Sequence, residues 1–137
     1  MDWKANVLVV ANRTADSGEL LDALCARAGR GPAEFTLVLP RNGADPVTAG
    51  NKLQSALERM RDAGLAIEGK IGDSDPLVAV QETWDPSRYD EVIVSTLPTN
   101  SSRWLQIDLP HRVAKVTNAT VTHVVATLAA STPPVRP

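Results

Sequence analysis

The sequence contains few metal-binding or disulfide-forming side chains and shows no excess of positive charge. Cys25 is its one cysteine, so an internal disulfide framework is excluded and a reducing, cytoplasmic compartment is expected. With two histidines besides, we expect no metal site. The formal net charge is −2, and Lys and Arg are spread along the chain. We therefore expect no nucleic-acid partner.

Long hydrophobic runs are also missing. The run Val7–Ala11 is far shorter than the roughly 18 apolar residues of a membrane span, and no signal-peptide cleavage pattern follows it. We expect no membrane partner. The length of 137 residues suits one domain, which we assign to residues 1–128. The proline-rich remainder, residues 129–137, is predicted to be a disordered or frayed tail.

Glycine is absent after Gly72, and this absence limits the chemistry of the second half of the chain. The predicted buried strand Glu91–Ser95 runs into the segment Thr96–Trp104, where a phosphate-binding loop would normally use glycine. The Walker phosphate loop, the Gly-x-Gly-x-x-Gly fingerprint and the Gly-x-Ser-x-Gly elbow are all missing. No activated nucleophile or paired-acid site can be assembled at a recognisable spacing, so we expect no enzyme.

Regular alternation of apolar runs and helical patterns indicates the fold. Helical patterns follow Asp16, Asp45 and Asp75, and a fourth covers Asp108–Val116 with Asp108 as its predicted cap. This alternation predicts a three-layer α/β/α sandwich around a five-stranded parallel sheet. The predicted strands cover residues 7–11, 35–39, 66–71, 91–95 and 121–126, with the third at an edge.

The first helical pattern is predicted to begin near Asp16, with Glu19 in its first turn. Its apolar stripe places Cys25 on the buried face, as a structural thiol rather than a nucleophile. The residues of this stripe are Leu20, Leu21, Leu24, Cys25 and Ala28.

Four segments, in their order and separation, resemble the universal stress protein family over roughly Lys4 to Ala126. The segments are Val7-Leu8-Val9-Val10-Ala11-Asn12, Gly72-Asp73-Ser74-Asp75-Pro76, Tyr89-Asp90-Glu91-Val92-Ile93-Val94-Ser95, and Arg112–Val116 followed by Val121–Val125. The resemblance implies a doubly wound, adenine nucleotide alpha hydrolase-like sheet with strand order 3-2-1-4-5. It also implies a ligand crevice at the carboxyl ends of the first and fourth strands.

Nucleotide-binding members of that family carry Gly-x-x-Gly after the fourth strand, and later a glycine followed by Ser or Thr. Here Ser95 and Pro98 stand at the first two glycine positions, and the later pair falls within Ile107-Asp108-Leu109. The family's usual acidic residue after the first strand corresponds most nearly to Asn12. The chain is more similar to the branch of the family that lacks these motifs and does not bind ATP. We therefore expect no ATP and no other cofactor.

Polar side chains beside the implied crevice leave two interpretations open. Hydroxyls, free helix N–H groups and guanidinium groups could hold a nucleotide or another small anion. Alternatively, the serines cap a short turn and Arg103 pairs with a surface carboxylate. Trp104 could stack on a base, or it could pack the loop over the sheet end. The candidate ligand-binding residues are Asn12, Arg13, Ser95, Thr96, Ser102 and Arg103.

The last predicted strand alternates polar and apolar residues, which is typical of a sheet edge with an unpaired backbone. Members of the family commonly dimerise through this strand, so the resemblance implies a homodimer. The candidate interface residues are Val121, Thr122, His123, Val124 and Val125. The leading hypothesis is a non-catalytic, dimeric stress-response or signalling module that acts through protein contacts. The alternative is a small-ligand or nucleotide-binding protein that uses a loop without glycine.

Overall fold

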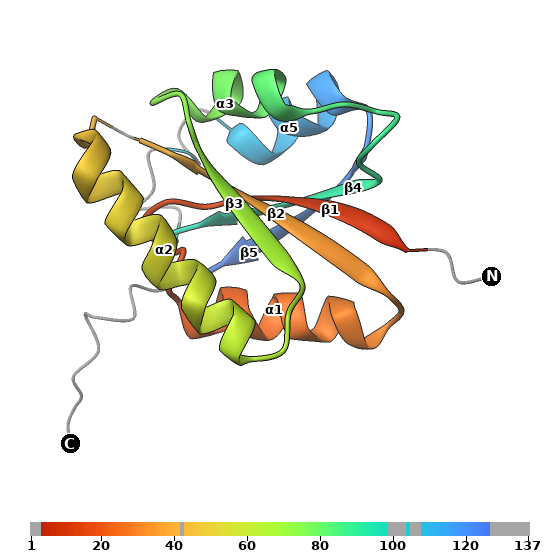
Figure 1. The fold of residues 1–137 in the computed structure, drawn as a ribbon. Coiled ribbons are helices and arrows are strands. Elements are labelled where there is room, and N and C mark those ends of the chain that lie inside the picture. Colours follow the sequence, from red (N-terminus) through yellow and green to blue (C-terminus); the bar gives the residue numbers. More distant parts are fainter. Residues whose placement is uncertain (1–3, 42, 99–103, 105–107, 127–137) are drawn as a thin grey trace.

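The computed structural model describes residues 4–41, 43–98, 104 and 108–126 (Figure 1). Its five strands form one parallel sheet in the order β3-β2-β1-β4-β5, which confirms the predicted fold class and strand order. The strands are β1 (Ala5–Val10), β2 (Ala33–Pro40), β3 (Ile67–Gly72), β4 (Glu91–Thr96) and β5 (Thr120–Val125). The helices are α1 (Gly18–Gly29), α2 (Pro46–Asp62), α3 (Pro76–Thr83) and α5 (Leu109–Thr117).

The helices lie in two layers, with α1 and α2 on one face of the sheet and α3 and α5 on the other (Figure 1). Strand β1 lies at the centre, and its side chains alternate between the two layers. Val7 and Val9 pack towards α1 and α2, whereas Leu8 and Val10 pack towards α3 and α5. This is why the first apolar run is continuous: both of its faces are covered.

The Asp-Pro pairs begin helices as predicted. Asp45 accepts a hydrogen bond from the Thr48 N–H at 2.8 Å at the start of α2. Asp75 accepts one from the Leu77 N–H at 2.9 Å at the start of α3. Each proline occupies the first turn, where its missing N–H breaks no helical hydrogen bond.

Helix α1 begins later than predicted. Its capping residue is Ser17, whose hydroxyl accepts from the Leu20 N–H at 3.1 Å, and not Asp16. The Ser17 N–H donates to the Thr14 carbonyl at 3.0 Å, and this turn delivers Ser17 to the capping position. Asp16 is left exposed.

The predicted burial of Cys25 is wrong, because the thiol is exposed. Leu20 and Leu24 are fully buried and define the centre of the inward face of α1. Successive helix positions are about 100° apart, so Cys25, one position beyond Leu24, is turned away from that centre. The rest of the predicted stripe holds, since Leu21 and Ala28 pack at the margin of the core.

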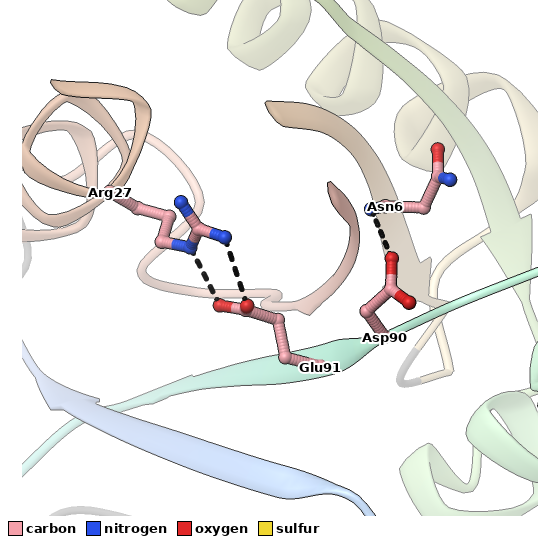
Figure 2. Close-up of polar contacts among 4 residues, drawn as sticks. All are labelled: Asn6, Arg27, Asp90 and Glu91. Carbon is pink, nitrogen blue, oxygen red and sulfur yellow. Dashed lines mark hydrogen bonds and ion pairs between the residues drawn. The ribbon is translucent and has the colours of Figure 1, made fainter. Parts of the chain in front are cut away.

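The amino ends of the central strands are fixed by polar contacts (Figure 2). Arg27 of α1 donates to both carboxylate oxygens of Glu91 at the start of β4, from Nε at 2.9 Å and from Nη2 at 3.1 Å. The Asp90 carboxylate accepts from the Asn6 N–H at 2.8 Å, and the Asp90 N–H donates to the Asn6 carbonyl at 2.8 Å. These charged groups therefore serve the fold.

Candidate functional site

The carboxyl ends of β1 and β4 lie side by side, because Val10 pairs with Val94 in the parallel register. Two predicted site residues, Ser95 and Thr96, end β4 at this edge. Ser95 is 1% exposed, and its Oγ lies 2.5 Å from the Oγ1 of Thr14, which is 2% exposed. The Ser95 hydroxyl is thus satisfied by the loop that follows β1.

Thr96 faces the opposite side of the sheet and contacts the neighbouring edge strand. Its side-chain Oγ1 lies 2.7 Å from the Nε2 atom of His123 in β5, and Thr96 itself is 2% exposed. Burial lowers the pKa of His123, because desolvation disfavours the imidazolium. The structure therefore separates the two predicted ligand groups and gives each a protein partner.

Asn12 is fixed in place where β1 ends. It is 8% exposed, and its Nδ2 donates to the backbone carbonyl of Pro40, the last residue of β2. Its Oδ1 accepts a long hydrogen bond of 3.4 Å from the Nζ of Lys52. The side chain where the family places an acid is thus a neutral amide that faces an ammonium group.

Sequence reasoning missed Lys52, which lies on α2 and reaches this edge. It follows Ala49 by three residues and precedes Ala56 by four, and both alanines are buried. Lysine within the apolar stripe of a helix was the signal that could have identified it. The side chain is half-buried.

The charges around Lys52 are unbalanced. Burial has the largest effect and lowers the pKa of Lys52. Two charges act on it in opposite directions, since Asp16 raises the pKa and Arg13 lowers it. The ion pairs among the described residues are Lys4–Glu34, Arg27–Glu91 and Arg88–Glu68, and none of them includes Lys52. Arg13 is exposed in the loop after β1, so two cationic side chains approach this edge.

Comparison with known proteins gives matches in structure only. No family model matches the sequence, and neither does any curated protein. One similar structure is a universal stress protein in complex with cAMP, with a TM-score of 0.67 and 21% identity over 93% of this chain and 100% of that one. A second is the universal stress protein from Archaeoglobus fulgidus, with a TM-score of 0.65 and 14% identity over 88% of this chain and 93% of that one. The chain has the universal stress protein fold.

Within the universal stress protein fold, the loop after β4 is described only in part. Ser102 and Arg103 lie outside the described residues, so their assignment to a ligand site stays a prediction. Trp104 is half-buried and packs against the core beneath α3 and α5, as the packing interpretation predicts.

Asp108 precedes α5 in a left-handed backbone conformation, with φ of 56° and ψ of 49°. It occupies the capping position, but its side chain makes no capping hydrogen bond, so the predicted cap is wrong in this respect. The resemblance places a glycine at or beside this position. The backbone at Asp108 thus has a conformation that glycine adopts more readily than other residues do, while the side chain carries a negative charge.

A hollow of about 420 Å³ lies where β3 ends, away from the predicted site residues, and is lined by Arg41, Ile71, Gly72, Asp73, Ser74 and Glu82. In the part of the chain that is described, no three His, Cys, Asp or Glu side chains gather as a metal site would require. No described helix has the length and hydropathy to cross a membrane.

Proposed function

We propose that this chain is a non-catalytic, universal-stress-protein-like module that acts in stress response or signalling through protein contacts. It works as a homodimer and lacks the ATP site usual in the family. The observation that carries this proposal concerns the side chains at the end of β4, which are buried and hydrogen-bonded within the protein. Ser95 bonds to Thr14, and Thr96 bonds to His123. A polyphosphate loop at this point requires open backbone N–H groups.

Substitutions at the family's glycine positions support the same proposal. Ser95 places a buried side chain at the first position, and Pro98 offers no N–H at the second. Asp108, at or beside the third, would repel a triphosphate. Each change works against close contact between the main chain and an anion.

Strand β5 supports the homodimer. Among the described strands it lies at the edge of the sheet and pairs with β4 alone, so its outer side offers backbone groups that can pair with a second copy. Two of the large apolar side chains exposed among the described residues belong to β5 and to the helix α5 that contacts it, namely Val125 at 48% and Val116 at 42%. Burial of these valines in a dimer would remove apolar surface from water.

Sedimentation velocity of the full chain at micromolar concentration tests the dimer. We expect a dimer for the wild type and a shift to monomer for Val125→Asp, which places a charge in the interface. Val47→Asp is the matched control, because Val47 is 72% exposed on α2 and should leave the dimer intact. Circular dichroism verifies that both variants fold. A monomeric wild type would contradict this part of the proposal.

Native mass spectrometry of protein purified without added ligand tests the nucleotide part. We expect the mass of a dimer of the chain with no bound nucleotide. A separate assay should detect no turnover across a panel of nucleotides and phosphate esters. An adenine nucleotide bound at one per chain would overturn the absence of the ATP site. Measurable hydrolysis would overturn the non-catalytic assignment.

A second candidate function is binding of a small ligand at the carboxyl end of the sheet. It is favoured by Lys52, a half-buried ammonium that lies in no ion pair among the described residues. A similar structure is a complex with cAMP, so this fold accommodates a nucleotide in at least one protein. A thermal-shift panel that includes cAMP tests this candidate. If Arg103→Ala leaves a ligand-dependent shift unchanged, Arg103 is not in the site.

A further inference from the structure

We propose that Lys52 and Arg13 together bind a small oxyanion, a carboxylate or phosphate group, beside Asn12 at the carboxyl end of β1. The inference rests on the second candidate function and names its ligand class and its anchoring residues. It places the anion at the end of β1 and makes no use of the loop after β4.

The geometry supplies a fixed platform. Asn12 is held by its hydrogen bond to the Pro40 carbonyl, and its Oδ1 accepts from Lys52 Nζ at 3.4 Å. A neutral amide oxygen orients the ammonium, but it cannot neutralise the charge. Lys52 Nζ has three donor positions, and among the described residues it donates to Asn12 Oδ1 alone, so the other two positions are open to a ligand.

The electrostatics favour an anion. A half-buried ammonium has lost part of its hydration, and among the described residues no carboxylate forms an ion pair with it. The charge of Asp16 acts on Lys52 without forming an ion pair with it, while Arg13 adds a second positive charge to the same region. An oxyanion between Lys52 and Arg13 would accept charge-assisted hydrogen bonds from both.

A purely structural role for Lys52 makes different predictions. If Lys52 serves only to orient Asn12, Lys52→Met removes that contact and destabilises the protein. If Lys52 is an anion anchor, the ligand-free protein bears an unpaired, partly desolvated charge. Lys52→Met then keeps the apolar stem, removes the charge, and leaves the urea midpoint unchanged or higher.

Binding is measured by isothermal titration and by NMR at constant ionic strength, with inorganic phosphate, acetate and AMP as separate probes. Phosphate and acetate distinguish a phosphate from a carboxylate preference, and AMP tests whether a nucleoside adds affinity. We expect Lys52→Met and Arg13→Gln each to weaken binding about tenfold or more. The matched controls Lys70→Met and Arg59→Gln remove exposed positive charges elsewhere and should bind as the wild type does.

The NMR titration of Lys52 gives an independent readout. Its pKa should rise when the bound probe stabilises the ammonium. The proposal is overturned if no probe binds the wild type, or if Lys70→Met weakens binding as much as Lys52→Met does. It is also overturned if Lys52→Met lowers the urea midpoint and leaves binding intact. None of these results alters the sedimentation or mass-spectrometric tests of the proposed dimer without ATP.

Discussion

Arg27 and Glu91 form a bidentate ion pair that joins helix α1 to the start of strand β4 (Figure 2). The side chains are 13% and 22% exposed. The hydrogen bond to Glu91 raises the pKa of Arg27, and this effect is larger than the lowering caused by burial. Partial burial reduces screening by solvent, so this pair should contribute more than exposed pairs do.

Removal of the guanidinium should therefore destabilise the fold. Arg27→Met should lower the free energy of unfolding by about 1–3 kcal/mol, because Glu91 would lose both donors in a partly buried position. Urea denaturation measures the change. The matched control is Lys4→Met in the Lys4–Glu34 pair, whose side chains are 53% and 51% exposed. Its expected change is below about 0.5 kcal/mol, and equal losses in the two variants would contradict the role of burial.

A second prediction concerns the close packing of α3 on the sheet. A Cβ built on Gly72 would lie 2.7 Å from the Cβ of Ala79 and 3.0 Å from Val38 Cγ1. Ala79 belongs to α3, so the helix would have to shift, and Gly72→Ala should destabilise the protein by about 1–3 kcal/mol.

Gly69→Ala is the control for that variant, because its added methyl would meet the flexible end of Leu53, 2.8 Å away, and side-chain atoms of Leu57. These side chains can change rotamer, so the loss should be smaller. Thermal unfolding ranks the two variants. A larger loss at Gly69 would show that α2 yields less readily than α3.

The sheet could be predicted from the sequence because local signals agreed with the tertiary structure. The run Val7–Ala11 is continuous because both faces of β1 are buried. Asp45 and Asp75 cap the helices α2 and α3 with their own side chains, and a proline follows each in the first turn. Cys25 was misplaced because one helix position decides between the core and solvent at the edge of an apolar stripe.

The site was less predictable because its contacts depend on side chains from distant segments. Lys52 reaches Asn12 across 40 residues of sequence, and Thr14 reaches Ser95 across 81. A polar residue at a strand end can face a ligand or bond to a neighbouring loop, and the local pattern is the same in both cases. The register of β1 beside β4 brings the loop after β1 next to Ser95, where the Ser95 hydroxyl bonds to Thr14. This pairing cannot be read from the local sequence.

A third prediction follows from the partly buried hydrogen bond between Thr96 and His123. Desolvation lowers the pKa of His123 in the folded state below its value of about 6.5 in the unfolded state. The unfolded chain therefore binds the proton more readily than the folded protein does. The stability from the neutral imidazole is complete above that unfolded value. It is lost as the pH falls from there towards the lower, folded-state pKa.

Urea midpoints measured between pH 8 and pH 5 should therefore fall for the wild type, and His123→Gln should reduce that fall. His111→Gln removes the other histidine, keeps His123, and is the matched control. If His111→Gln reduces the fall and His123→Gln does not, desolvation of the His123 imidazole is not its source.

A last prediction separates backbone conformation from charge at Asp108. Its φ of 56° lies in the left-handed region, which costs an ordinary residue about 1–2 kcal/mol and glycine almost nothing. Asp108→Gly should therefore be at least as stable as the wild type in urea, whereas Asp108→Ala should be less stable by about 1 kcal/mol. Asn118 has a φ of 54° at the end of α5 and is the matched position, where Gly and Ala should rank in the same order.

The same variant tests whether Asp108 alone accounts for the proposed absence of an ATP site. Asp108→Gly removes the carboxylate and introduces a glycine, but Ser95 still bonds to Thr14 and Pro98 still offers no N–H. We therefore expect no ATP binding by Asp108→Gly in equilibrium dialysis. If the single change creates ATP binding, the charge of Asp108 was the only barrier, and the buried Ser95 and Pro98 place no obstacle in the way of the phosphates.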